Sequence, residues 1–293
     1  MVSEENYARE EARLGRQVHF HDGVWWVKSA PFYYKPVHEF RPFPPKHAKP
    51  NPVKAMLGYS HQVPNSTQAK RFLRWNILNS DKLKIFTLDR LKSAKRRAIR
   101  KGLKECHVEQ FKPSDNNLER MRLINISQAR RFKKIGEVDT YLPEDYYNLN
   151  AAHWREDMIK QFSHQAHQFI GAFVNEQLVA YIDLIVIEDT WLFGAVKSCD
   201  DYLDHRPVDA LYFNIINRAS QCGKCSRVVN GGGYEERVSL TRFKEEYLLE
   251  PTDLPYYSIT FLSMNKLMKL KSALLIWRRG RNKIDFGRRE KKV

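Results

Sequence analysis

The chain has 293 residues, and 50 lysines and arginines against 34 acidic residues give it a formal net charge of +16. Hydrophobic residues make up 42% and aromatic residues 12%, which excludes a globally disordered chain. No apolar run reaches the roughly 20 residues that a membrane-spanning helix needs, and no export signal is visible, so we expect a cytosolic protein. The positive charge favours a polyanionic partner: tRNA or other nucleic acid, an anionic membrane surface at the inner face, or a phosphorylated substrate.

The first 64 residues are expected to pack on a main domain as an addition. Residues 19–38 alternate aromatic and aliphatic side chains, which predicts one or two strands. Residues 40–52 contain five prolines, and these exclude a helix or a central strand. We expect this segment to be an extended strap over the domain surface.

Helices are predicted next. Asn65 or Ser66 can cap a helix over residues 67–78, because apolar residues recur there at helical spacing. A second helix, over residues 91–103, has one apolar face and is otherwise crowded with positive charge. Like charges repel, so a surface for RNA, lipid headgroups or a diphosphate-bearing acceptor explains this helix better than a solvated face. Its basic residues are Lys92, Lys95, Arg96, Arg97, Arg100, Lys101 and Lys104.

The segment that follows predicts a short strand over residues 108–111 and a helix over 118–132. A further helix opens at Pro143 and runs to about Phe162. Between this helix and the next strand lie His164 and His167, which we expect on the surface.

Three consecutive strands are predicted over residues 169–174, 177–187 and 190–197, which are rich in β-branched and aromatic residues. Pro207 suits the first position of a helix that ends near Gly223.

Three glycines then follow a short strand. Val228 and Val229 lead into Asn230 and Gly231–Gly233, whose backbone can take positive φ and admit another molecule closely. A helix bearing Phe243 comes next, and residues 256–261 predict a closing strand.

This order, with Gly231–Gly233 after a strand, the segment Phe243–Tyr247 and the basic run Leu91–Leu103, resembles the GNAT acyl-CoA N-acyltransferase fold. The resemblance is to its branch of FemAB-like and BioF2-like (CelD-type) proteins and covers about residues 68–257. It implies an α/β (mixed α+β) fold with one mixed, mostly antiparallel sheet flanked by helices. We expect N-terminal strands and strap over 1–64, an acyltransferase domain over 65–262 and a basic C-terminal helix or tail over 263–293.

The resemblance also implies an activity: transfer of an acetyl or aminoacyl group to an amine, such as an amino sugar, a peptide or a cell-envelope precursor. In the family a splayed pair of strands exposes backbone N–H groups for the acyl carbonyl, and a glycine-containing loop holds the coenzyme A pyrophosphate at a helix N-terminus. Here residues 199–209 hold no glycine and four aspartates, which would repel a pyrophosphate. Acetyl-CoA or another acyl-CoA and aminoacyl-tRNA therefore both stay open as donors.

Three residues are the candidates for catalysis. Lys244, within Phe-Lys-x-x-Tyr, could place a cation near the reacting carbonyl, and otherwise is an exposed helix lysine. Asp183 interrupts an apolar strand, where a carboxylate needs a partner or a cleft. If it faces a cleft, its raised pKa would suit a general base. The alternative is an edge position that faces water. Tyr234 could be an acid for the leaving group, as could Tyr212, although core packing suits both. The expected donor- or acceptor-binding residues are Asn230, Gly231, Gly232, Gly233, Phe243, His205 and Arg206.

Three alternatives remain. The fold could be catalytically inactive and serve as a basic binding module for RNA or an anionic membrane. Cys222 and Cys225 form a C-x-x-C pair without further ligands at matching spacing, so buried thiols are favoured over a metal site. Leucines and Trp277 among the arginines of the tail slightly favour a membrane surface over RNA.

Overall fold

The computed structural model describes residues 1–134, 142–232 and 238–260. The chain divides into a larger unit, Met1–Glu10 with Leu73–Leu254, and a smaller unit, Glu11–Phe72 with the chain from Pro255 on. The fold is mixed α/β with mostly antiparallel strand pairs, as the sequence predicts. Among the described residues, no helix combines the length and the apolar character needed to cross a membrane.

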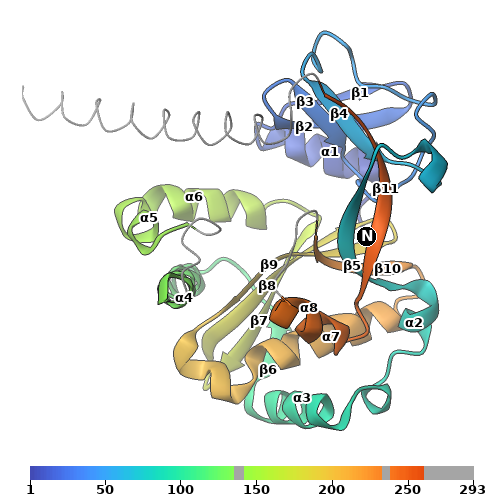
Figure 1. Ribbon diagram of the computed structural model, residues 1–293. Coiled ribbons are helices and arrows are strands. Elements are labelled where there is room, and N and C mark those ends of the chain that lie inside the picture. The colour runs from blue at the N-terminus through green and yellow to red at the C-terminus, as the bar shows by residue number, and fades with distance from the viewer. Residues whose placement is uncertain (135–141, 233–237, 261–293) are drawn as a thin grey trace, which may run out of the picture. The chain divides into compact units, whose positions relative to one another are not determined.

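The larger unit has a sheet with the strand order β11-β5-β10-β9-β8-β7-β6 (Figure 1). Strands β9 and β10 are parallel, whereas β10 with β5, and each neighbouring pair from β9 to β6, are antiparallel. Strands β5 and β11 each run from one unit into the other. The strand bounds are β5 Arg71–Asn79, β6 His107–Gln110, β7 His167–Val174, β8 Gln177–Ile187, β9 Thr190–Ser198, β10 Arg227–Gly232 and β11 Glu250–Thr260.

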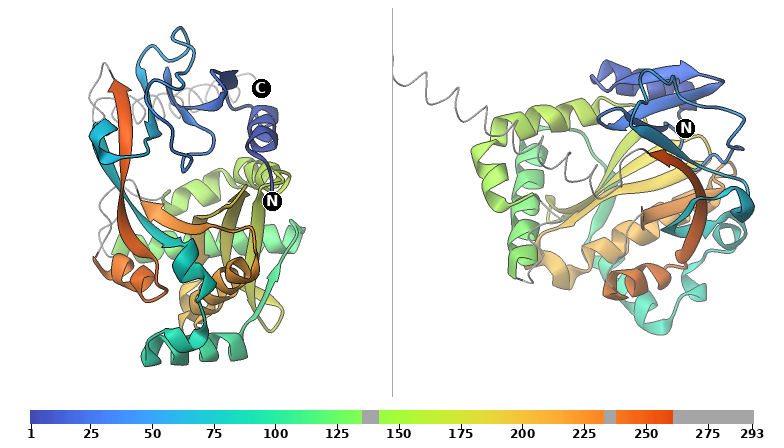
Figure 2. Two further views of the ribbon diagram at one scale, coloured as in Figure 1. Left: turned by 90° about the vertical axis from the view of Figure 1, so that its right-hand side faces the viewer. Right: turned by 45° about the horizontal axis from the view of Figure 1, so that its top comes forward.

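Helices cover both faces of this sheet, and Figure 2 shows the two layers from other sides. On face A, α7 crosses between β9 and β10, and its apolar side packs with α2, α3 and α8 over one core. On face B, α4, α5 and α6 pack over a second core. The helix bounds are α1 Glu4–Arg13, α2 Ser80–Lys84, α3 Ser93–Glu105, α4 Asp115–Lys134, α5 Glu144–Leu149, α6 Ala151–Phe162, α7 Pro207–Gln221 and α8 Val238–Glu245.

The smaller unit contains the strand order β1-β2-β3-β4-β11. Its core is aromatic, with Trp26, Phe43 and Tyr59 buried together. Residues 40–52 contain neither helix nor strand, as five prolines require. The bounds are β1 Val18–His21, β2 Val24–Ala30, β3 Tyr33–Pro36 and β4 Gly58–Gln62.

The predicted helix over residues 67–78 is wrong. A 3₁₀ turn at Ser66–Gln68 is followed by strand β5. Leu78 and Asn76 are buried at alternate positions because they lie opposite Val228 and Asn230 of β10. The apolar residues of this segment fit both the helical and the strand periodicity. Pairing with β10 decides in favour of the strand.

Most other elements follow the predictions. The helix predicted over 143–162 is interrupted at Asn150 and forms α5 and α6. The turn between β7 and β8 has positive φ at Asn175 (48°) and Glu176 (64°), the backbone that a two-residue hairpin requires. Gly233, Tyr234 and the predicted tail over 263–293, with Trp277, lie outside the described residues.

Candidate functional site

The parallel ladder between β9 and β10 stops halfway along β9. Pairing runs from Thr190 opposite Arg227 to Phe193 opposite Asn230. Beyond Phe193, strand β9 continues to Ser198 paired with β8, and within the described residues it has no further partner on the β10 side. Main-chain groups on that edge are therefore left without a strand. This pattern matches the opening between neighbouring strands that the resemblance implies.

Two irregularities at the same level explain why the strands part. In β9, Gly194 is an extra residue between the pairs Phe193–Leu184 and Ala195–Asp183. In β10, the register against β5 shifts between Asn230 and Gly232, where Gly231 has a φ of +62°. Bulges bend a strand and disrupt its ladder, so two of them here direct the strands apart. The glycines that the sequence analysis selected, Gly231 and Gly232, form the end of β10 beside this opening.

Lys244 lies at the end of the same ladder, on face A. Its side chain is only 2% exposed, and its Nζ donates a hydrogen bond to the carbonyl oxygen of Asn230 at 3.0 Å. The amide of Asn230 donates to the hydroxyl of Tyr212, which is also buried. The alternative of an exposed helix lysine is therefore wrong. Lys244 is a cation held against the last residue of β10 that pairs with β9.

A buried ion pair continues this network and corrects one prediction. Lys95, expected on the basic surface of the helix, is only 7% exposed. Its Nζ lies 2.8 Å from Asp209 Oδ1 and 2.9 Å from Glu246 Oε2. The same ammonium lies over the rings of Phe243, at 4.3 Å, and Tyr247, at 4.7 Å. Phe243 at the end of α8, with Glu246 and Tyr247 just after it, thus surrounds the Lys95 ammonium, and Phe243 has this structural partner.

Tyr247 completes the network. Its hydroxyl donates to Asp209 Oδ1 at 2.6 Å, and burial followed by the charge of Asp209 holds its pKa well above the usual value. Asp200, in the turn before α7, pairs with Arg131 at 2.6 Å. Two of the four aspartates in this loop are therefore neutralised by cations of this chain. The predicted repulsion of an anion by all four is wrong for Asp200 and Asp209.

His205 and Arg206 lie where α3 meets the start of α7. His205 Nδ1 is 2.9 Å from Glu105 Oε2. Arg206 is the N-cap of α7 in the left-handed conformation, with φ 56°, and its side chain is exposed. A Cβ on Gly102 of α3 would come within 2.6 Å of the Arg206 carbonyl oxygen, so this glycine lets the two helices approach closely.

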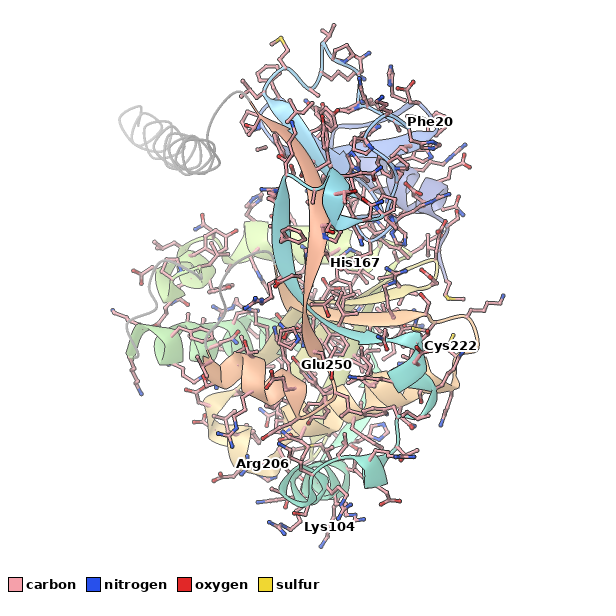
Figure 3. The ribbon with its side chains drawn as sticks, turned by 45° about the vertical axis from the view of Figure 1, so that its right-hand side comes forward. Phe20, Lys104, His167, Arg206, Cys222 and Glu250 are labelled. Carbon is pink, nitrogen blue, oxygen red and sulfur yellow. The ribbon has the colours of Figure 1, made fainter. Side chains whose placement is uncertain are left out.

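The remaining basic residues of α3 do form a surface. Arg96 is half-buried and donates to the Asp89 carbonyl oxygen at 3.1 Å. Figure 3 shows Lys104 on the outer side of α3, with Arg206 nearby at the start of α7. The exposed basic residues of α3 are Arg97, Arg100, Lys101 and Lys104.

On face B the opening is flanked by an aspartate–histidine pair. Asp183 is buried, which excludes the edge position facing water, and its Oδ1 lies 2.8 Å from His167 Nδ1. His164 and His167 were predicted on the surface, and this is wrong: His164 is 1% exposed and the His167 side chain 12%. The His164 ring lies between the rings of Tyr7, at 4.7 Å, and His167, at 4.8 Å.

Lys197 of β9 lies on the same face, opposite Tyr181 of β8 and beyond the end of the β10 ladder. Burial, followed by the charge of Arg131, lowers the pKa of Lys197 to about 8. Its ammonium therefore loses a proton far more readily than an ordinary lysine does. Sequence analysis did not select Lys197, and it assigned His167 to the surface without a role. The signal available for Lys197 was a charge within a predicted strand, three residues past Gly194.

Cys222 and Cys225 are half-buried free cysteines at the end of α7. Within the described chain, no group of three or more His, Cys, Asp or Glu side chains is arranged to hold a metal ion.

Neither a family model nor a curated protein matches the sequence. Solved structures do match. FemX is 11% identical, with a TM-score of 0.56 over 87% of this chain and 91% of FemX. The C-terminal (DUF2156) domain of an Agrobacterium fabrum protein described as a lysylphosphatidylglycerol synthetase is 10% identical, with a TM-score of 0.55 over 94% of this chain and 97% of that one. L-PGS from Bacillus licheniformis is 13% identical, with a TM-score of 0.52 over 95% and 98%.

The chain has a FemAB-like GNAT fold. Identities this low establish the fold alone, so chemistry must be inferred from the opening and its side chains.

Proposed function

We propose that this protein is an N-acyltransferase that moves an aminoacyl or acetyl group from aminoacyl-tRNA or an acyl-CoA to an amine. The observation that carries this proposal is the end of the β9–β10 ladder at Phe193 and Asn230, beyond which the β10 side of β9 has no strand partner among the described residues. Main-chain N–H groups there could hold an acyl carbonyl while an amine attacks it. Positioning of this kind supplies a large part of the barrier reduction in acyl transfer, up to about 7–11 kcal/mol.

Lys244 supports the proposal from face A. Its buried ammonium lies against the Asn230 carbonyl, at the level where the strands part. A cation in a site with little water stabilises negative charge that develops on a nearby oxygen. We therefore retain Lys244 as a residue that polarises the donor carbonyl, with Asn230 and Gly231–Gly232 as the adjoining main chain.

The surroundings of the opening favour a large, negatively charged donor. Helix α3, whose exposed side chains include Arg100 and Lys101, packs on α7, and its Gly102 lies close to the Arg206 carbonyl oxygen at the start of α7. A helix N-terminus beside several cations attracts phosphates, whether of tRNA or of coenzyme A. One structurally similar protein is described as a lysylphosphatidylglycerol synthetase. That name supports an aminoacyl group as the group transferred. The acceptors to test here are the amines that the sequence analysis named: an amino sugar, a peptide or an envelope precursor.

The test is a transfer assay with labelled acetyl-CoA and labelled aminoacyl-tRNA against a panel of amines. We expect one donor to raise the melting temperature of the protein, because binding to the native state stabilises it. The same donor should support transfer that falls at least about tenfold in Lys244→Met, while Lys224→Met, an exposed control beyond the end of α7, stays active. Donor binding without transfer to any amine, or full activity in Lys244→Met, would count against this proposal.

A second function deserves the same assay, because the net charge of +16 and the exposed cations of α3 would also suit an inactive binding module. Such a module would bind RNA or anionic vesicles with an affinity that falls steeply with salt. Replacing Arg97, Arg100 and Lys101 by glutamine should then make the slope of log affinity against log salt concentration shallower by about three. No donor would be consumed.

A further inference from the structure

We propose that His167 is the general base that removes a proton from the acceptor amine, and that Asp183 is the residue that positions it. This inference rests on the proposed acyl transfer. It changes the role that the sequence predicted for Asp183, because the Asp183 carboxylate is hydrogen-bonded to the His167 ring.

The hydrogen bond between the two side chains decides which nitrogen can act. His167 Nδ1 lies 2.8 Å from Asp183 Oδ1. An ionised carboxylate only accepts hydrogen bonds, so Nδ1 carries the imidazole proton and Nε2 keeps its lone pair. Nε2 makes no hydrogen bond within the residues that the structure describes. A histidine held by a carboxylate on one nitrogen, with the other available, is the arrangement of a general base.

Asp183 lies on β8, next to β9, and His167 lies on β7, one strand further from the edge of β9 that has no partner beyond Phe193 within the described residues. Asp183 is the β8 partner of Ala195, the residue after the Gly194 bulge. A Cβ on Gly194 would lie 3.2 Å from both Asp183 Oδ2 and the Asp183 carbonyl oxygen. Gly194 itself is exposed. The bare bulge therefore gives the carboxylate room and leaves an accessible surface beside it, where the ladder with β10 has ended.

The two faces of the sheet then divide the reaction. Cations and the start of α7 lie on face A, where Lys244 contacts Asn230. Asp183 lies on face B, because residues two apart in a strand share a face and Tyr181 of β8 belongs to the second core. A donor reaching the opening from face A would present its carbonyl to an amine arriving from face B. Figure 3 labels His167 near the middle of the view and Arg206 and Lys104 toward its lower end.

The proposed step balances without another reactant. The amine nitrogen bonds to the acyl carbon as His167 Nε2 accepts one N–H proton. The bond from that carbon to the ester oxygen of tRNA, or to the thioester sulfur, then breaks. The imidazolium returns the proton to the departing oxygen or sulfur, which leaves an amide and a free hydroxyl or thiol.

Other titratable groups surround His167 and set the controls. Asp183 faces it from β8, His164 from the end of α6, and Tyr7 stacks on His164 from α1. Lys197, with its lowered pKa, lies on the same face of β9 and is the competing base. His153 on α6 is exposed and serves as the matched control.

The experiment compares transfer rates and pH profiles of wild type, His167→Gln, Asp183→Asn, Lys197→Met and His153→Gln. We expect kcat to fall about 100-fold in His167→Gln, with the donor KM little changed, since general bases contribute about 10²–10⁴-fold. The acidic limb of the kcat/KM profile should disappear in this variant. Added imidazole should restore part of the rate of His167→Ala, which a merely structural role would not allow.

Transfer by His167→Gln at the wild-type rate and with the same acidic limb would overturn the inference and leave the acyltransferase standing. So would a loss of rate confined to Lys197→Met, or a His167→Ala variant that imidazole does not restore. Absence of transfer by the wild type with every donor and amine would instead overturn the proposed function, and the base with it.

Discussion

Two polar clusters lie on opposite faces of the larger unit's sheet, and they differ in how fully their groups are paired. On face A, Lys95, Asp209 and Tyr247 are buried and bonded to one another. On face B, His167 and Asp183 share one hydrogen bond beside an exposed glycine. Closed networks of buried charge maintain a structure, whereas a partly open pair can exchange a proton with a substrate. The segment Phe243–Tyr247, which carries part of the resemblance, therefore belongs mainly to the closed cluster.

The largest expected effect tests whether the face A cluster is structural. Lys95→Met removes one partner of a buried pair and leaves Asp209 without its cation, so the free energy of unfolding should fall by about 3–5 kcal/mol. Chemical denaturation measures this loss, and Lys104→Met on the exposed side of the same helix should change it by less than about 0.5 kcal/mol. Similar stability in both variants would show that the pair at 2.8 Å contributes little.

A smaller effect tests the openness of the face B cluster. Gly194→Ala places a methyl group 3.2 Å from Asp183 Oδ2 and from the Asp183 carbonyl oxygen, so the carboxylate that holds His167 must shift. We expect the transfer rate to fall about tenfold, less than the roughly 100-fold that a 1 Å misplacement can cost. The control is Gly223→Ala, where an added Cβ meets nothing within 4 Å. Equal transfer rates in the two variants would show that the Gly194 bulge does not affect the reaction.

The smallest effect concerns Lys197, whose pKa is lowered from 10.5 to about 8. Between those values the unfolded chain binds the lysine proton and the folded chain does not, so this residue makes stability rise with pH across that window. Below pH 8 the folded state bears the full cost of the buried charge. Lys197→Met should therefore melt at a higher temperature than wild type at pH 7. The difference should shrink from pH 8 to 10.5, and a constant difference would contradict the lowered pKa.

Local patterns predicted the part of the fold that surrounds the opening. Strands β7, β8 and β9, the proline at the start of α7 and the glycines of β10 were all predicted close to where they occur. Strand β5 was not, because residues 71–79 fit both periods until a neighbouring strand is known. Similarly, lysine is a residue type that usually lies on the surface, and Lys95 is buried only because Asp209, 114 residues away, pairs with it.

By itself, the sequence determined the order of elements and the residues that could bend them, since periodicity and backbone freedom are properties of neighbours along the chain. The tertiary structure alone decided which charges are buried, where the β9–β10 ladder ends and which histidine an aspartate holds. Those outcomes depend on contacts between distant segments. Hydrogen bonding and desolvation at such contacts change the behaviour of a side chain more than its own identity does.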